Sequence, residues 1–251
     1  MIDCGQKLYP MGSLYIHGTE TFYPSQFAVP DFVLPSDHID VWLTRINPPI
    51  LTLKNFLTPA EQERAQRYRN QLAHDQFVTG RAVLRWLSAK YTNQPMDVLV
   101  YEESEGSKPY WRSPAHELHF NLTHSGEHIA VCFGRKELGI DMEQLNERFT
   151  YEDVLDRCFS EQEKHFIRTA PGPRSVFYQY WTRKEALVKA IGSGLQNDII
   201  SVPCIEGNHD SRFNKDWELR SFQLSNEIFL TIVFQPAIQK IRFMNFDDLS
   251  V

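Results

Sequence analysis

The sequence has no long apolar run and few cysteines, and each shortage excludes a class of protein. The longest apolar runs, at residues 129–133 and 228–234, are far shorter than the roughly 20 residues of a membrane-spanning helix. The four cysteines form no Cys-x-x-Cys pair, which argues against a zinc ribbon or disulfide framework and favours a reducing compartment. The N-terminal residues show no apolar segment before a cleavage site, so we expect a cytoplasmic protein without a secretion signal.

An excess of basic residues is also missing. The chain has 26 Lys and Arg against 32 Asp and Glu, a net charge of −6, which is unlike a nucleic-acid-binding protein. Any anionic ligand must therefore be met by locally placed cations. With 251 residues, of which 42% are hydrophobic, the chain has the composition of a globular protein with one large or two small domains.

The chain divides into an N-terminal segment and two stretches of similar pattern. Residues 1–36 hold four of the 14 prolines and little periodicity, which predicts an extended surface arm. We expect a first subdomain over residues 37–136 and a second over residues 137–251. Alternation and capping signals predict strands near 39–44, 98–101, 117–123, 128–133, 138–142, 199–204, 217–224, 227–234 and 241–244, and helices from 59, over 75–91 and 151–157, from 161, and over 175–191.

A weak internal echo accompanies this division. Phe120-Asn-Leu-Thr precedes an apolar strand pattern at residues 129–133, and Phe222-Gln-Leu-Ser precedes another at residues 230–234. Strand patterning alone often produces such echoes, so by itself this one leaves duplication and coincidence equally open.

Two carboxylates stand two residues apart in Gly139-Ile-Asp-Met-Glu143. On a strand, Asp141 and Glu143 project from the same face, while Ile140 and Met142 face the core. Two close carboxylates repel each other unless a cation holds them, and Mg²⁺ prefers oxygen ligands. The pattern fits either a divalent metal site or a solvated strand end.

A second candidate lies within the helix expected over residues 175–191, in the segment that reads Trp181-Thr-Arg-Lys-Glu185 and continues to Lys189. Glu185 and Lys189 are four residues apart, so they form either a surface ion pair or two groups that face a cleft. In the second case the carboxylate would bind a metal or act as a general base, and the ammonium would bind phosphate oxygens. A third candidate is Thr123-His124-Ser125, whose polar groups could bind a phosphate or only cap a turn. Lys108 lies in a loop that on its own is a plain surface turn.

Taken in order, these fragments resemble the 4′-phosphopantetheinyl transferases of the larger, monomeric type that activates surfactin-like peptide synthetases. The resemblance spans roughly residues 57–195. Its motifs are F-N-[IV]-[ST]-H-S at 120–125, G-[IV]-D-[IVL]-E at 139–143 and W-x-x-K-E-[AS]-x-x-K-x-x-G-x-G-[LI] at 181–195. Ser107 and Ser193 depart from the glycine and lysine usual in the family.

The resemblance implies an α+β fold of two similar subdomains in a pseudo-twofold arrangement, each an antiparallel sheet packed with helices. It implies that a serine of an apo acyl or peptidyl carrier protein attacks the β-phosphorus of coenzyme A at the subdomain interface, so that 4′-phosphopantetheine moves to the serine and 3′,5′-ADP leaves. The implied cofactor is Mg²⁺, with Mn²⁺ also suitable.

The resemblance also implies a role for each matching residue. Asp141, Glu143 and Glu185 would hold the metal. Glu185 would also be the base, and Lys189 would neutralise the pyrophosphate. Contacts to coenzyme A are implied for Arg64, Arg81, Lys108, Thr123 and His124.

Two other classes of function remain open. The chain could be a non-catalytic paralogue that binds coenzyme A or a carrier protein, although such a protein has no need of a base. It could also be a metal-dependent phosphohydrolase that needs no carrier. We expect a monomer with no nucleic-acid or membrane partner, while fatty-acid, polyketide and peptide-synthetase carriers all remain possible.

Overall fold

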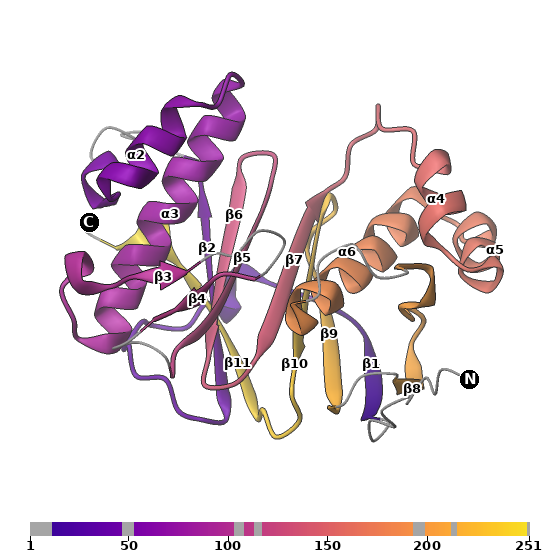
Figure 1. Ribbon diagram of the computed structural model, residues 1–251. Coiled ribbons are helices and arrows are strands. Elements are labelled where there is room, and N and C mark those ends of the chain that lie inside the picture. The colour runs from indigo at the N-terminus through magenta and orange to yellow at the C-terminus, as the bar shows by residue number, and fades with distance from the viewer. Residues whose placement is uncertain are drawn as a thin grey trace, which may run out of the picture.

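The computed structural model describes residues 12–46, 53–102, 108–112, 117–192, 199–211 and 215–249, so Ser107 and residues 193–195 of the third motif lie outside it. Its helices are α2 (Pro59–Gln66), α3 (Gln71–Thr92), α4 (Glu152–Cys158), α5 (Glu161–Thr169) and α6 (Pro173–Ile191) (Figure 1). Its strands are β1 (Gly12–Thr21), β2 (His38–Arg45), β3 (Tyr101–Glu102), β4 (Tyr110–Trp111), β5 (His119–Ser125), β6 (His128–Gly134), β7 (Leu138–Gln144), β8 (Gly207–Ser211), β9 (Trp217–Ser225), β10 (Ile228–Phe234) and β11 (Lys240–Asn245).

Two mixed sheets form the centre of the fold. The first sheet has the strand order β11-β2-β6-β5, and the second has the order β7-β10-β9-β1-β8. Neighbouring strands are antiparallel except for β11 with β2 and β1 with β9. A short hairpin of β3 and β4 lies apart from both sheets. The expected α+β class is confirmed, and the sheets, which were expected to be antiparallel, are antiparallel except for one parallel pair in each.

The two sheets pack face to face between two long helices. Buried side chains of both sheets, such as Val41, Ile140 and Leu230, form one core between them. A second core joins α3 to the other face of the first sheet, and a third joins α6 to the second sheet. Figure 1 shows α3 and α6 on opposite sides of β5, β6 and β7. Among the residues described, no helix has the length and apolarity needed to cross a membrane.

The same order of elements occurs twice. In the first half (β2 to β6), helices and then the hairpin β5–β6 follow β2, and β6 lies between β2 and β5. In the second half (β7 to β10), helices and then the hairpin β9–β10 follow β7, and β10 lies between β7 and β9. The echo in the sequence therefore aligns β5 with β9 and β6 with β10, which favours duplication over coincidence.

The terminal strands depart from the expected arrangement. Residues 12–21 are not a surface arm, because β1 pairs with both β8 and β9 and buries Leu14 and Ile16 completely or nearly so. The last strand, β11, belongs to the first sheet although it was expected in the second subdomain. Each half thus receives a parallel strand from the opposite end of the chain.

Two expected strands are wrong. The one at 98–101 overlaps β3 only at Tyr101, because Met96–Val98 form a 3-10 helix. The apolar run at 199–204 forms a short 3-10 helix (Ile199–Ser201) and an irregular segment, and the strand lies further on, at β8. The carbonyls of Ile199 and Val202 accept hydrogen bonds from the buried ammonium of Lys184, at 3.1 and 2.5 Å. These contacts use backbone acceptors that a sheet ladder would need.

Candidate functional site

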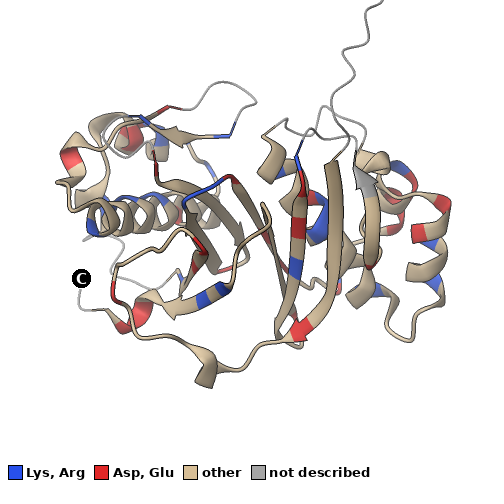
Figure 2. Cartoon of the chain, turned by 90° about the horizontal axis from the view of Figure 1, so that it is seen from below, with Lys and Arg blue, Asp and Glu red and all other residues tan. Residues whose placement is uncertain are grey.

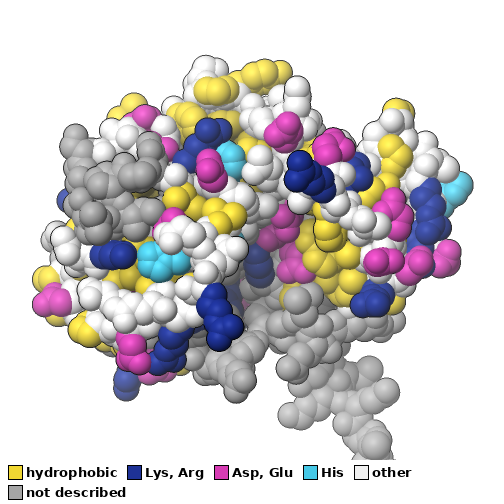
Figure 3. Space-filling model, turned by 90° about the horizontal axis from the view of Figure 1, so that it is seen from above, with side chains coloured by type: hydrophobic (Ala, Val, Ile, Leu, Met, Phe, Trp, Pro, Cys, Tyr) yellow, Lys and Arg dark blue, Asp and Glu magenta, His cyan; other side chains and the backbone are white. Residues whose placement is uncertain are grey.

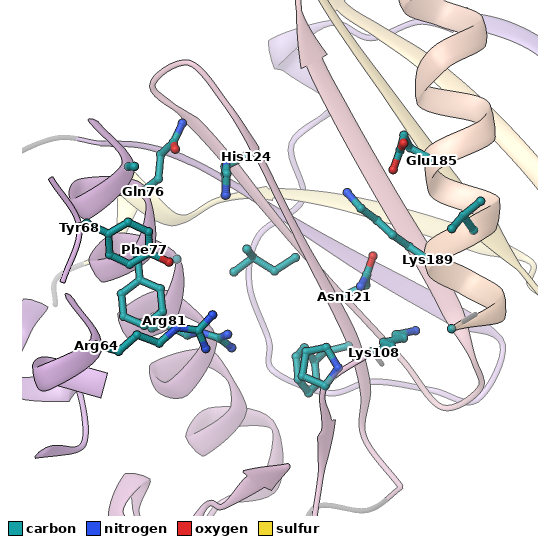
Figure 4. A pocket seen from close by; sticks show the side chains of 17 residues that line it. Arg64, Tyr68, Gln76, Phe77, Arg81, Lys108, Asn121, His124, Glu185 and Lys189 are labelled. Carbon is teal, nitrogen blue, oxygen red and sulfur yellow. The ribbon is translucent and has the colours of Figure 1, made fainter. Parts of the chain in front are cut away.

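A cavity of about 460 Å³ opens between the two halves of the molecule. Seen from above, the surface is hollowed there, and acidic and basic side chains lie inside the hollow (Figure 3). Residues of α2 and α3 line one side, β5 lines the middle and α6 lines the other side. Six of the nine predicted site residues line this cavity: Arg64, Arg81, Lys108, His124, Glu185 and Lys189 (Figure 4).

Aromatic rings support the two arginines of the first half. The guanidinium of Arg64 lies 5.1 Å from the ring centre of Phe77, and that of Arg81 lies 5.5 Å from the same ring and 4.7 Å from Tyr101. Such cation–π contacts hold a guanidinium in place without neutralising its charge. Figure 4 shows both side chains extending from their helices to one side of the cavity. They provide the local cations that an acidic protein needs for an anionic ligand.

Lys108 and His124, which also line this cavity, have lowered pKa values. Burial lowers the pKa of Lys108, whose ammonium donates a hydrogen bond to the carbonyl of Leu138. Burial, and then the charge of Lys189, lower the pKa of His124, so its imidazole is neutral at pH 7. A neutral imidazole can donate one hydrogen bond and accept another.

The carboxylates of β7 face α6. Ile140 and Met142 are buried in the core between the sheets, which places the alternate residues Asp141 and Glu143 on the other face, as expected. Gly139 begins this motif because α6 packs directly against it. A Cβ at Gly139 would overlap the backbone of Ala186 and Ala190. This close approach brings the helix that carries Glu185 and Lys189 against the strand that carries the two acids.

Lys189 bonds across the junction of β7 and α6. Its Nζ lies 2.5 Å from Oδ1 of Asp141 and 3.4 Å from the hydroxyl of Thr123. Thr123 is buried, and it points toward the carboxylates instead of lining the cavity. The contact between Thr123 and coenzyme A that the resemblance implies stays a prediction.

The acidic groups share one electrostatic environment. Burial, and then the charge of Asp141, raise the pKa of Glu143 to about 7 and also raise the pKa of Glu185. Burial raises the pKa of Asp141 despite the opposing effect of Lys189. A carboxyl group with a pKa of about 7, as in Glu143, is partly protonated at neutral pH unless a cation takes the place of the proton.

The donor set fits a hard divalent cation. Oδ2 of Asp141 is buried and has no hydrogen-bond partner among the residues described. An unpartnered carboxylate oxygen next to two further acids with raised pKa values is what an oxygen-ligated ion would satisfy. Within the same described ranges, no three acidic, histidine or cysteine side chains already form a group that could hold a metal ion. The ammonium of Lys189 forms an ion pair with Oδ1 of Asp141.

A second cavity, of about 690 Å³, lies on the other side of the acids. Glu143 and Ser125 line it together with apolar side chains such as Leu145, Phe149 and Trp181. Glu185 lines the first cavity and Glu143 the second, with Asp141 buried between them. Acidic residues of the same group therefore line both cavities.

Several residues of the site were not singled out from the sequence as site residues. Tyr68, Gln76 and Phe77 line the first cavity, and Phe77 was noticed only as part of an apolar helix face. Ser125 was singled out only for binding a phosphate or capping a turn, whereas its hydroxyl donates a hydrogen bond to Glu143. The alternation of Asn121, Thr123 and Ser125 along one strand was the signal that could have revealed their common direction.

Comparison with known proteins finds two matching family models and several similar proteins. Residues 46–134 match the family model "4′-phosphopantetheinyl transferase, N-terminal", and residues 137–233 match the "4′-phosphopantetheinyl transferase superfamily". The chain is 32% identical over 176 residues to 4′-phosphopantetheinyl transferase HetI of Nostoc sp., covering 66% of this chain and 73% of HetI. It is 33% identical to AcpT of Escherichia coli, covering 57% and 71%, and 26% identical to psf-1 of Bacillus pumilus, covering 59% and 64%.

Proposed function

The chain belongs to the 4′-phosphopantetheinyl transferase superfamily, and we propose from this premise that it transfers 4′-phosphopantetheine from coenzyme A to a serine of an apo carrier protein. The serine Oγ forms a bond to the β-phosphorus of the pyrophosphate. The bond between that phosphorus and the bridging oxygen breaks, and 3′,5′-ADP leaves with the bonding electron pair. The serine proton passes to a base of the enzyme.

The observation that carries this proposal is the position of Glu185 beside a cavity lined by four cationic residues. Arg64 and Arg81 stand on one side of the cavity and Lys189 on the other, with Lys108 at the edge (Figure 4). A nucleotide with three phosphates supplies the negative charge that such a cavity accepts. We assign Arg64, Arg81, Lys108 and His124 to the nucleotide and Lys189 to the pyrophosphate.

Glu185 is the proposed base. Its raised pKa brings its proton affinity closer to neutral pH, where a general base is most effective. It lies on the same helix as Lys189, one turn away, so the base and the cation that attracts the pyrophosphate move together. Asp141, Glu143 and Glu185 would hold Mg²⁺ or Mn²⁺, which when bound supplies charge for the developing phosphate oxygens.

The second cavity is the proposed approach for the carrier serine, because Glu143 stands at its inner surface and its apolar residues can exclude water. We further propose a cytoplasmic monomer. One chain lines both cavities, and the described cysteines, Cys132, Cys158 and Cys204, are free thiols.

The test is a transfer assay followed by mass spectrometry. The protein is incubated with coenzyme A, Mg²⁺ and several apo carriers from fatty-acid, polyketide and peptide-synthetase systems. The expected result is one added phosphopantetheinyl group per carrier, lost on addition of EDTA and restored by Mg²⁺. Absence of the adduct from every carrier contradicts the proposal, and breakdown of coenzyme A without any carrier indicates a phosphohydrolase.

Glu185→Gln tests the assignment of the base. The amide keeps the size of the side chain but accepts no proton, so kcat should fall by about 10²- to 10⁴-fold while the melting temperature stays within a few degrees. Glu152→Gln, an exposed glutamate on α4, is the matched control and should keep full activity. A Glu185→Gln protein with near-normal turnover at saturating Mg²⁺ would exclude Glu185 as the base.

A further inference from the structure

The two sheets meet along β5 and β7 through side chains instead of a backbone ladder. Each of these strands lies at the edge of its own sheet. The alternate N–H groups of Ile140, Met142 and Gln144 on β7 have no strand partner in the second sheet, because β10 pairs on the opposite edge. They donate to side-chain oxygens of β5 at 2.8, 3.3 and 2.9 Å.

The acceptors are Asn121, Thr123 and Ser125, one for each N–H. Each donor lies 19 residues after its acceptor, so β5 and β7 run in the same direction with a fixed register. A strand presents every second residue on one face, which explains why these three side chains reach the same strand.

Two of the three acceptors also bond to the carboxylates. The hydroxyl of Thr123 donates to Oδ1 of Asp141 at 3.1 Å, and that of Ser125 donates to Oε2 of Glu143 at 2.8 Å. A hydroxyl has one proton and two lone pairs, so it can accept from the backbone and donate to a carboxylate at the same time. The second lone pair of Thr123 accepts from Lys189.

These bonds couple the carboxylates to the first sheet. Thr123 and Asp141 are each only 4% exposed, so water has little access to replace a lost hydroxyl. Because β5 also lines the cavity beside Arg64 and Arg81, the same strand connects the cations of the first half with the acids of the second half. Among the described contacts, the side chain of Asn121 accepts from the backbone N–H of Ile140 and reaches neither carboxylate.

We propose that Thr123 and Ser125 are positioning residues that fix the carboxylates of Asp141 and Glu143 in register with the first half of the molecule. This inference rests on the proposed function, since it gives these acids their place at the reacting end of coenzyme A. Thr123 acts through Asp141 and Lys189, and Ser125 acts through Glu143. Each hydroxyl engages one carboxylate oxygen and leaves the other oxygen of that group for a cation.

The experiment compares Thr123→Val and Ser125→Ala with the conservative Thr123→Ser and Ser125→Thr. Two quantities are measured: kinetic constants of the transfer reaction, and Mn²⁺ affinity by electron paramagnetic resonance with no carrier present. Groups that orient metal ligands typically contribute about 10- to 100-fold to metal affinity or activity. We expect Thr123→Val and Ser125→Ala to lower kcat and Mn²⁺ affinity by about that factor, to leave KM for coenzyme A within about threefold, and to be rescued by the conservative variants.

Thr44→Val is the matched control. Thr44 is a buried threonine whose hydroxyl donates to the carboxylate of Asp247 at 2.5 Å, outside both cavities. The Thr44→Val protein should be less stable than wild type but keep its kcat and Mn²⁺ affinity. If Thr123→Val does not fold, Ser125→Ala decides, because Ser125 is only partly buried.

Folded Thr123→Val and Ser125→Ala proteins with kcat and Mn²⁺ affinity within twofold of wild type would overturn the inference, as would losses that the conservative variants do not restore. A wild-type protein without Mn²⁺ affinity overturns it too. If the wild type binds Mn²⁺ but modifies no carrier, the proposed function fails, and the Mn²⁺ titrations still decide the positioning role.

Discussion

Each half of the molecule contains a buried ion pair between a capping-box glutamate and a cation of the next long helix, which we call the clamp. The residues that line the cavity beside the clamp differ between the two halves. In the first half, Glu61 is the third residue of α2 and closes the capping box begun by Thr58, whose N–H it accepts at 2.8 Å. It also accepts from Arg85 of α3 at 2.6 Å, and Arg85 donates to the carbonyls of Met96 and Leu99. One carboxylate thus fixes the start of one helix to the side of the next.

The second half repeats this arrangement with a different cation. Glu163 is the third residue of α5 and closes the capping box begun by Ser160, whose N–H it accepts at 2.8 Å. Its carboxylate also forms an ion pair with Lys184 of α6 at 3.0 Å. Lys184 also donates to two backbone carbonyls. The third partner differs, since a tyrosine hydroxyl reaches Glu61 whereas the thiol of Cys204 reaches Glu163.

The comparison separates the scaffold from the chemistry. Beside the clamp, α3 presents Arg81 to the cavity, and α6 presents Glu185 and Lys189. Figure 2 shows basic and acidic residues interspersed over both halves. The two halves therefore differ in the charged residues that line the cavity and not in their overall charge. The same frame therefore supplies cations for a nucleotide on one side and acids for proton and metal chemistry on the other.

The largest effect should come from breaking the clamps. Glu61→Gln and Glu163→Gln each leave a buried cation without its counter-ion, which typically costs about 3–5 kcal/mol. Since Lys184 is fully buried and Arg85 is 4% exposed, we expect Glu163→Gln to be the more damaging of the two. Urea unfolding measures both losses.

Glu161→Gln, at the first position of α5, is the control for the clamp variants. The side chain of Glu161 is 87% exposed, so its loss should cost less than about 1 kcal/mol. A clamp variant that costs no more than this control would show that the corresponding clamp does not stabilise its half.

The clamps also show what local sequence signals can and cannot reveal. The capping boxes of Thr58 and Ser160 and the strand with Asp141 were predictable because each depends on residues within a few positions of one another. The pairing of Glu61 with Arg85 joins residues 24 positions apart, and no periodicity marks it. Such pairs depend on how the elements pack, which the spacing of residues does not encode.

The missed strand β1 has a different cause. Leu14 and Ile16 alternate with more exposed residues, which is a strand signal, but prolines before and after the segment suggested an arm. Its partners, β8 and β9, lie about 190 to 200 residues further along the chain. Local patterning can predict that a segment is extended, whereas the sheet it joins is decided by long-range packing.

The second prediction concerns a smaller effect, which follows from the opposite pKa shifts of a clamp glutamate, Glu61, and a site glutamate, Glu143. Burial alone would raise the pKa of Glu61, but the N–H of Thr58 and then Arg85 lower it below its usual value. Glu143 behaves oppositely, since burial and then Asp141 raise its pKa to about 7. The folded protein therefore binds a proton at Glu143 more tightly than the unfolded chain does.

This difference predicts an effect of pH on stability. Between the unfolded pKa near 4.5 and the folded value of about 7, the unfolded chain loses the proton first, so the contribution of Glu143 to stability falls as pH rises. With EDTA present, wild type should lose about 1–3 kcal/mol more than Glu143→Gln between pH 5 and pH 8. Urea unfolding at both pH values measures this, and equal pH dependence in the two proteins would contradict it.

The smallest effect tests whether the first half serves the nucleotide and not the chemical step. If Arg81 contacts the 3′-phosphate of coenzyme A, Arg81→Ala should raise KM for coenzyme A by about tenfold and leave kcat within about twofold, a loss near 1.4 kcal/mol. With dephospho-coenzyme A, which lacks that phosphate, wild type and variant should have similar constants. Arg67→Ala, whose side chain is 72% exposed at the end of α2, is the matched control and should change neither substrate's KM. A fall in kcat, or an equal rise in KM for both substrates, would show that Arg81 does not act on the 3′-phosphate. It would also contradict the assignment of nucleotide binding to the first half and of the chemical step to the second.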